Sequence, residues 1–490
     1  MPTATVSLAI IGQGVMGQNL ALNFASHGIN LSVFDLNPNH VEHSVALSQS
    51  LDGTILGADS LCDLLTQLPP PRAIVLSLPA GNAIDASCDA LLEAGLDRED
   101  LVIDSGNCHW DDTLARQQRY QGKLRFLASA ISGGEVGARH GPSLMISGSF
   151  LAWQQIAPLW HTIAAKADNR NGQPLPTVSD NPNAVPCAGY VGPDGSGHFV
   201  KTIHNGIEYA QMQLWAEAYQ LLKQHGQMSN NAIAALFKQW QLGPLQSYLL
   251  DCTIAVLEAI DEVTDTPLLP LIVDAAGQKG TGTWTAKASL ALGVAAPSVH
   301  SAVAARAISS QKALRQQLSQ QLASSSQAAL SAVELQGLHS ALEQALLGAT
   351  LINYAQGFEV IASQAQQQQW PLDLAAIAQL WRAGCIIRTP LLQTMAQALA
   401  CDPDAHLLED RKIQQRLNPT LPLWRRTLLA GISAGVALPV FSSALAYVDG
   451  LRCADSPANL LQGMRDHFGG HRFRRYDDPS GALHHHPWPR

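Results

Sequence analysis

Charged side chains are scarce in this chain of 490 residues. They make up 14% of the sequence, and 30 Lys and Arg residues against 39 Asp and Glu residues leave a formal net charge of −9 at pH 7. Such a chain repels nucleic acids and anionic membranes unless its cations are gathered locally, so we expect neither partner. Hydrophobic residues make up 47%, which excludes a disordered chain. The length predicts two or three domains.

Cysteine pairs and membrane-type segments are also lacking. The eight cysteines are scattered without C-x-x-C spacing, and a chain of this length needs no disulfides to hold its core. Reduced thiols and a cytoplasmic location are therefore expected. Residues 1–11 lack the positive charge of a secretory signal. The longest uncharged stretch, residues 427–448, is interrupted by two glycines and a proline, which predicts a buried pair of helices rather than a membrane span.

No group of histidines, cysteines and carboxylates shows the spacing of a metal site. The run His484-His485-His486 stands near the end of the sequence, in a short polar segment. We therefore expect no metal ion.

The chain divides into two regions of different pattern. Up to about residue 150, short apolar runs alternate with segments long enough for helices, which predicts a parallel sheet with helices on both faces. The runs lie at residues 6–11, 31–34, 73–78, 101–103, 125–128 and 143–147. Residues 167–197, rich in Asn, Pro and Gly, predict a long connection or an insertion. From residue 198 to about 453, Ala, Leu and Gln at helical spacing predict an almost entirely helical region.

A glycine-rich turn follows the first predicted strand directly and opens a predicted helix. It fills the G-x-G-x-x-G pattern, whose glycines let the backbone approach a pyrophosphate at a helix N-terminus. Its residues are Gly12, Gln13, Gly14, Val15, Met16 and Gly17. The fold class predicted is therefore a doubly wound, Rossmann-like α/β domain (residues 1–195), a large all-α domain (196–453) and a short tail (454–490).

The second predicted strand ends at Asp35. A carboxylate at this position can accept hydrogen bonds from the ribose hydroxyls of NAD, and it would repel the 2′-phosphate of NADP. No Lys or Arg occurs before Arg72 to offset that charge. The pattern favours NAD, although Asp35 could also be a simple turn residue before Pro38.

Four polar residues share one face of a predicted helix that opens the second region. Lys201, His204, Asn205 and Glu208 are spaced i, i+3, i+4 and i+7. A solvated surface face is the alternative, but flanking glycines and the rarity of lysine, nine in the whole chain, favour an active site. Desolvation can lower a lysine pKa toward that of a base, and burial can keep a glutamate protonated as an acid. Lys201 and Glu208 are the candidate base and acid.

These residues and others along nearly the whole chain resemble the 6-phosphogluconate dehydrogenases, the decarboxylating enzymes of the pentose phosphate pathway. The matching stretches are residues 15–20, 131–135, 141–145, 197–209, 276–282, 381–388, 457–460 and 465–469. The resemblance implies oxidation and decarboxylation of 6-phosphogluconate to ribulose 5-phosphate and CO2, with hydride transfer to NAD or NADP and without a metal.

The resemblance also implies a role for each site residue. Lys201 would be the base and Glu208 the acid, while His204 and Asn205 would hold the substrate hydroxyls and carboxylate region. The acid end of the substrate would be lined by Ser132, Gly133 and Gly134, and Asn107 would contact both substrate and cofactor. The phosphate would be bound by Tyr209, Lys279, Thr281 and Arg306. Two tail residues match those that the family inserts from the partner subunit, which implies a homodimer with exchanged tails: Arg465 and His471.

The chain departs from the family where the 2′-phosphate of NADP would lie. Asp35-Leu36-Asn37 stands in place of the usual Asn-Arg-Thr, and His40 in place of a Lys. Further departures are Pro79, Ser105, Cys108 and Val136. We therefore predict a preference for NAD, or at least weakened selectivity for NADP.

Two other functions remain open on the sequence alone. A related β-hydroxyacid dehydrogenase could act on a different small sugar acid, but Lys279, Arg306 and Arg465 would then have no phosphate to bind. A non-catalytic dinucleotide-binding protein would have no use for the four polar residues of the predicted helix.

Overall fold

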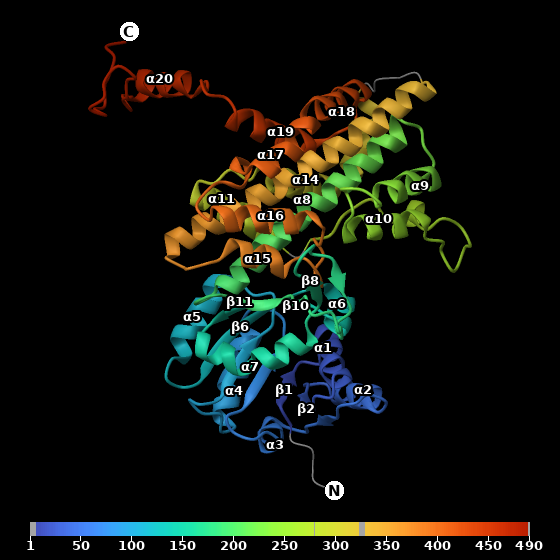
Figure 1. The fold of residues 1–490 in the computed structure, drawn as a ribbon, viewed down its shortest axis with the longest axis vertical. Helices are drawn as coiled ribbons and strands as arrows, with labels where there is room; N and C mark the ends of the chain where they lie inside the picture. The colour runs from blue at the N-terminus through green and yellow to red at the C-terminus, as the bar shows by residue number, and fades with distance from the viewer. Residues whose placement is uncertain (1–5, 279, 323–328, 489–490) are drawn as a thin grey trace.

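The structure, a computed structural model, describes residues 6–278, 280–322 and 329–488. Figure 1 shows an N-terminal α/β region, a helical region stacked on it, and a C-terminal segment that projects from the helical region. The predicted fold class, a doubly wound α/β region followed by a helical one and a short tail, is confirmed.

An eight-stranded sheet forms the N-terminal region, with the strand order β11-β7-β6-β5-β4-β1-β2-β3. Each of the six predicted apolar runs coincides with one of its strands. These strands are continuously apolar because helices cover both faces of the sheet. The strands are β1 (Leu8–Ile11), β2 (Leu31–Phe34), β3 (Ile55–Gly57), β4 (Ala73–Leu76), β5 (Leu101–Asp104), β6 (Arg125–Ser132), β7 (Ser143–Gly148) and β11 (Ala188–Gly192). The helices are α1 (Val15–Ser26), α2 (Pro38–Ser48), α3 (Leu61–Thr66), α4 (Asn82–Glu93), α5 (Trp110–Tyr120), α6 (Gly134–His140) and α7 (Phe150–Ile163).

One pair of strands departs from the predicted parallel arrangement. β7 runs antiparallel to β6, with Leu127 opposite Gly148 and Ser132 opposite Ser143. Only the seven-residue helix α6 joins the two strands, and a helix of that length spans about 10 Å. The eight residues of β6 extend further, at about 3.3 Å per residue. The chain therefore cannot return to the start of β6, and β7 enters the sheet from the opposite end.

The segment predicted as a long connection contains four short strands. Three form a small antiparallel sheet in the order β10-β8-β9, and β11 then joins the edge of the main sheet parallel to β7. The three are β8 (Lys166–Asp168), β9 (Pro174–Leu175) and β10 (Ala184–Pro186). Strands of two to five residues are too short to show a hydrophobic period.

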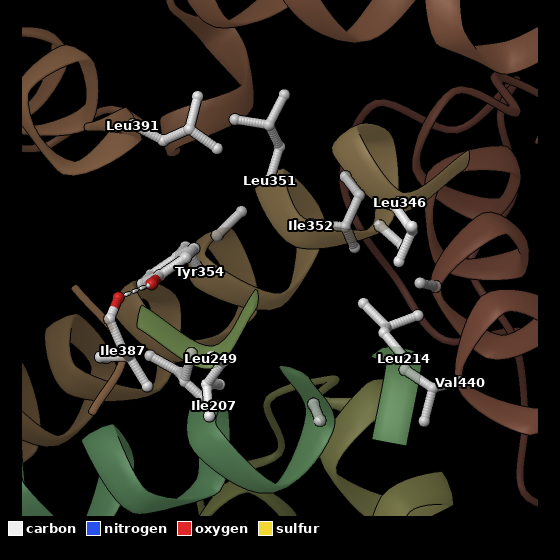
Figure 2. Close-up of a cluster of buried hydrophobic side chains, with 14 of the residues drawn as sticks. Ile207, Leu214, Leu249, Leu346, Leu351, Ile352, Tyr354, Ile387, Leu391 and Val440 are labelled. Carbon is white, nitrogen blue, oxygen red and sulfur yellow. Dashed lines mark hydrogen bonds between the residues drawn. The ribbon is translucent and has the colours of Figure 1, made fainter. Parts of the chain in front are cut away.

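Two long helices form the centre of the helical region. α8 (Ser196–Gln224) and α14 (Ala332–Gln368) pack against each other, and their apolar faces share one core. In Figure 2 the α8 residues Ile207 and Leu214 lie below the α14 residue Ile352, and the Tyr354 hydroxyl donates a hydrogen bond to the carbonyl of Ile387. The other elements are α9 (Asn230–Trp240), α10 (Tyr248–Glu258), α11 (Thr281–Leu292), α12 (Pro297–Ser309), α13 (Lys312–Gln321), α15 (Leu374–Leu380), α16 (Leu391–Cys401), α17 (Arg411–Leu417), α18 (Leu421–Ala434), α19 (Pro439–Leu451), α20 (Ala458–Gly469), and the 3-10 turns η1 (Leu269–Leu271), η2 (Leu407–Glu409) and η3 (Asn418–Thr420).

The uncharged stretch at residues 427–448 is a pair of helices, as predicted. α18 ends at Gly435, which has a left-handed conformation, and α19 begins at Pro439. The pair is less buried than expected, because Leu429 and Ile432 of α18 face outward. Among the helices of the described residues, none has the length and apolar character that crossing a membrane requires.

Candidate active site

The glycine-rich turn lies between β1 and α1, and local geometry explains why each of its three glycines stands there. A Cβ on Gly12, whose φ is 94°, would lie 2.4 Å from the carbonyl oxygen of Ser77. A Cβ on Gly17 would lie 1.9 Å from the carbonyl oxygen of Gly12. Gly14 instead faces open space and is exposed beside Val15, while Met16 is partly buried. The first and third glycines thus permit close packing, and the second leaves the helix N-terminus open to a ligand.

Asp35 lies directly beside this turn. Its Oδ2 accepts a hydrogen bond of 2.6 Å from the backbone N–H of Gln13, and its Oδ1 accepts one of 2.9 Å from the N–H of Asn37. The Nδ1 of His40 lies 3.4 Å from Oδ1. Asp35 therefore forms a local turn, and its carboxylate lies beside the glycine-rich turn, while its predicted role toward the ribose of NAD stays a prediction.

Most of the predicted polar face of α8 is buried rather than solvated, and only Glu208 at its end is half-buried. Lys201 is 7% exposed, and its Nζ donates hydrogen bonds to Asn205 Oδ1 at 2.6 Å and to Ser132 Oγ at 3.4 Å. His204 is fully buried, with Nδ1 at 3.4 Å from the lysine Nζ and Nε2 at 3.2 Å from Ser132 Oγ. The structure thus brings these residues of α8 together with the end of β6.

Burial sets the protonation of this cluster. Desolvation lowers the pKa of Lys201, against a smaller opposing effect of the Glu208 carboxylate. Desolvation, reinforced by the charge of Lys201, holds the pKa of His204 well below its ordinary value. Desolvation raises the pKa of Glu208, although Lys201 and Arg306 oppose that rise. Burial therefore disfavours the charged forms of the lysine, the imidazole and the carboxyl in this cluster.

The loop after β6 lies against a loop of the helical region. Gly133 has a φ of 122°, and a Cβ there would lie 2.4 Å from the carbonyl oxygen of Gly384. Gly134 has a φ of 62° and opens α6. The Gly384 carbonyl also accepts a hydrogen bond of 3.0 Å from the N–H of Ser143. These contacts fix Ser132 beside Lys201.

A cationic side chain is held further along the same helix. The guanidinium of Arg306, on α12, stacks 3.5 Å from the ring centroid of Tyr209, which follows Glu208 on α8. α11 begins at Thr281, and a Cβ on Gly282 would lie 2.4 Å from the Tyr209 ring. A guanidinium, a phenol and a helix N-terminus on the side of Glu208 form a fitting site for an anionic group.

Two family models match the chain. The model described as the NAD binding domain of 6-phosphogluconate dehydrogenase matches residues 7–172, and the model of the 6-phosphogluconate dehydrogenase C-terminal domain matches residues 197–488. The chain belongs to the 6-phosphogluconate dehydrogenase family. The resemblance inferred from the sequence is confirmed, and the N-terminal region is a domain that binds a nicotinamide cofactor.

Individual relatives match over nearly the full length. The decarboxylating 6-phosphogluconate dehydrogenase of Treponema pallidum is 40% identical over 98% of this chain and 96% of its own. The enzyme of Rattus norvegicus is 38% identical over the same shares. The solved structure of Plasmodium falciparum 6-phosphogluconate dehydrogenase superposes with a TM-score of 0.91 at 31% identity, covering 98% of this chain and all of that one. That enzyme has been solved in its apo form, with its cofactor NADP+ and with its substrate 6-phosphogluconate.

Asn107, Arg465 and His471 lie outside the cluster around Lys201. Asn107 is exposed on the loop after β5. Lys279 lies outside the described residues. Arg465 and His471 belong to the C-terminal tail, which projects away from the helical region in Figure 1, so the structure does not bring them to the site of their own chain.

Sequence reasoning assigned no role to the loop at residues 381–388, although the loop forms one wall of the site. The Trp381 ring packs edge-on against His204 with ring centroids 5.5 Å apart, and the Cys385 thiol donates to the Trp381 carbonyl. Burial raises the pKa of Cys385 to about 12, so the thiol stays neutral beside Lys201. In the sequence, Gly384 was the one sign of a special backbone conformation in this loop, and its φ of 69° suits glycine.

Proposed function

We propose that this chain catalyses the oxidative decarboxylation of 6-phosphogluconate to ribulose 5-phosphate and CO2, with a nicotinamide cofactor. The observation that carries the proposal is the buried Lys201, held by Asn205 and Ser132, on the same helix face as a carboxyl with a raised pKa. The names of relatives that match over 96% or more of their length support the same reaction.

The residues of the glycine-rich turn fit the cofactor. Gly14 leaves open space at the N-terminus of α1, where backbone N–H groups can face a pyrophosphate, and Gln13 and Asp35 stand beside it. When bound, the cofactor supplies the hydride acceptor.

Lys201 acts first as a base. Its lowered pKa lets the neutral amine accept the proton of the substrate C3 hydroxyl, and oxidation at C3 then gives a 3-keto acid. Such an acid loses its C1 carboxylate as CO2 because the ketone accepts the electron pair. The ammonium that Lys201 has become donates a hydrogen bond to the developing oxyanion. Glu208 then gives its proton to the carbon that carried the carboxylate.

We further propose that the enzyme prefers NAD. Asp35 places a carboxylate beside the glycine-rich turn, where it would repel the 2′-phosphate of NADP, and Leu36, 94% exposed, offers no charge to offset it. Arg72, the first cation of the sequence, already pairs with the buried Asp100, with Nη1 3.0 Å from Oδ2. A kcat/KM for NADP more than tenfold above that for NAD would overturn this preference.

We also propose a homodimer in which Arg465 and His471 of each tail complete the partner's substrate site. The projecting α20 carries exposed apolar side chains, Leu460 at 67% and Phe468 at 73%, which suit burial against a second chain. The mass in solution tests the dimer, and a monomer with full activity would contradict it.

The reaction is tested with 6-phosphogluconate and with gluconate as substrates. Only 6-phosphogluconate carries a phosphate that Arg306 and Tyr209 can bind, so we expect a far higher kcat/KM for it than for gluconate. Equal values would favour a dehydrogenase for unphosphorylated sugar acids, and no turnover of either would favour a non-catalytic protein.

A further inference from the structure

The tail folds around one buried carboxylate. Asp466 of α20 is 0% exposed, although the residues on either side of it are open to solvent. Its Oδ1 accepts hydrogen bonds from the backbone N–H of Arg472 at 2.8 Å and from Nδ1 of His485 at 2.9 Å. Its Oδ2 accepts from the backbone N–H of His486 at 3.0 Å and from Nε1 of Trp488 at 2.9 Å. Four donors from two separate parts of the tail, residue 472 and residues 485–488, thus meet at one side chain.

A fully buried aspartate is exceptional unless its oxygens are paired. Burial opposes the charge of Asp466, but the hydrogen bonds from His485, His486, Trp488 and Arg472 outweigh it, and its pKa lies well below the ordinary value. The carboxylate therefore stays ionised and holds the end of the tail against α20. The sequence had indicated a loose polar segment here, and the structure corrects that interpretation.

Asp466 and the backbone that it binds at Arg472 lie next to the two proposed substrate-binding residues of the tail. Arg465 precedes Asp466 on α20, and His471 immediately precedes Arg472, whose N–H the carboxylate holds. Gly470 ends the helix with a φ of 60°, and the His471 ring lies over Gly469, where a Cβ would come within 2.6 Å of Nε2. Asp466 thus closes the turn that directs His471 relative to Arg465.

The chain beyond this turn is held as well. Phe473 and His484 exchange two backbone hydrogen bonds of 2.8 Å, which makes a small hairpin of residues 473–484. The hairpin returns the chain to Asp466, where residues 485–488 supply three of the four donors. The tail is therefore a folded unit with its own polar centre.

We propose that Asp466 is a positioning residue for the reaction, which presents Arg465 and His471 to the partner's substrate as one preformed group. A preorganised segment loses less conformational entropy on binding than a free one. The inference rests on the proposed function and on the exchange of tails, and it adds a residue that touches neither substrate nor cofactor.

The first test is Asp466→Asn, with Asp477→Asn as the matched control. The amide cannot accept all four hydrogen bonds, so we expect at least a tenfold rise in the KM for 6-phosphogluconate, with an unchanged KM for NAD and an unchanged dimer. Asp477 pairs only with Arg475 among the described contacts, and its variant should keep the wild-type KM. An unchanged KM in Asp466→Asn would overturn the proposal, and so would loss of the dimer, which would assign Asp466 to folding.

A second variant guards against a general loss of folding. Trp488→Phe keeps an aromatic ring but removes one of the four donors, so the KM for 6-phosphogluconate should rise less than in Asp466→Asn. If the KM for 6-phosphogluconate rises in Asp466→Asn but not at all in Trp488→Phe, the hydrogen bonds of the carboxylate do not cause the rise, and the proposal is overturned.

Hybrid dimers distinguish an effect of the tail on the partner's substrate site from an effect on the site of its own chain. A dimer of one Asp466→Asn chain and one Lys201→Met chain has one site with an intact lysine, and the tail that reaches that site is intact too. We expect this hybrid to show the wild-type KM and about half the wild-type kcat. A hybrid with the raised KM of Asp466→Asn would overturn the proposal, whereas a wild-type protein that does not oxidise 6-phosphogluconate would instead overturn the proposed function.

Discussion

The Nζ of Lys201 lies 2.6 Å from Oδ1 of Asn205, one helical turn further along α8. The amide oxygen carries no charge, so it orients the lysine without strongly favouring the ammonium form. Desolvation is left as the largest influence on the pKa of Lys201, and it lowers that pKa. The pair thus suits the proposed role of Lys201, which requires a neutral amine at the start of the reaction.

Replacing Asn205 with Asp should move the pH profile. A carboxylate at this distance stabilises the ammonium form, so the acidic limb of kcat/KM should shift to higher pH by about 1–3 units. Asn205→Ala removes the hydrogen bond without adding charge, and it should lower kcat without that shift. Profiles with the same acidic limb in both variants would contradict the role of Lys201 as base.

Glu208→Gln should remove the proposed proton donor. Burial raises the pKa of Glu208, so its acid form is lost only as the pH rises through that raised value. The variant should lose roughly 10²- to 10⁴-fold in kcat, and the descending limb of the pH profile should disappear. Glu217→Gln makes the same change on the same helix outside the site, and it should retain that limb. Retention of the limb in Glu208→Gln would rule out this residue as the acid.

The double change Asp35→Asn with Leu36→Arg should improve the use of NADP. It removes a repelling carboxylate and adds one charge-assisted phosphate contact, which we expect to strengthen transition-state binding by about 1–3 kcal/mol. Asn can still accept a hydrogen bond from Gln13, so the turn is kept. Leu36→Arg alone, with Asp35 in place, should gain less. The ratio of kcat/KM for NADP to that for NAD measures the effect in the double and the single variant. An unaltered ratio would contradict the proposal that Asp35 and Leu36 set the cofactor preference.

Gly282→Ala should weaken binding of the substrate phosphate. The added methyl would lie 2.4 Å from the Tyr209 ring, so the ring must move and the stacked Arg306 with it. Loss of that stacking should cost about 1 kcal/mol or more, seen as a higher KM for 6-phosphogluconate. Gly337→Ala, on α14 with open space around it, is the control. A normal KM in Gly282→Ala would show that the stacked pair does not bind the phosphate.

Glu217 should make stability depend on pH. Its carboxylate accepts hydrogen bonds from the N–H groups of Val440 and Phe441 at the start of α19, yet burial outweighs them and raises its pKa from 4.5 to about 7. Between these values the folded protein holds a proton that the unfolded chain has released, so stability falls as pH rises. From pH 4.5 to 8 the wild type should lose about 3 kcal/mol of unfolding free energy relative to Glu217→Gln.

Denaturant unfolding at several pH values measures this difference. The exposed Glu262→Gln serves as the control and should follow the wild type. Parallel stability curves for the wild type and Glu217→Gln would contradict the raised pKa.

Local patterns predicted the parts of the site that lie within one segment. The turn from Gly12 to Gly17 has a fixed spacing after a strand, and the polar face of α8 follows from the helical period alone. The contact between His204 and Trp381 joins distant segments, and no local pattern encodes it. Asp466 was missed for the same reason, because its partners come from both sides of a hairpin whose bridge is a single residue pair. The antiparallel β7 follows from the length of α6, which the apolar runs do not reveal.

The most direct measurement uses 6-phosphogluconate labelled with ¹⁴C at C1, and it compares released ¹⁴CO2 with the reduced nicotinamide formed. If Lys201 and Glu208 carry out oxidation and decarboxylation in one site, the two products should appear in equal amounts, and Lys201→Met should abolish both. Reduced nicotinamide without labelled CO2, or equal activity in the Lys201→Met variant, would contradict the account.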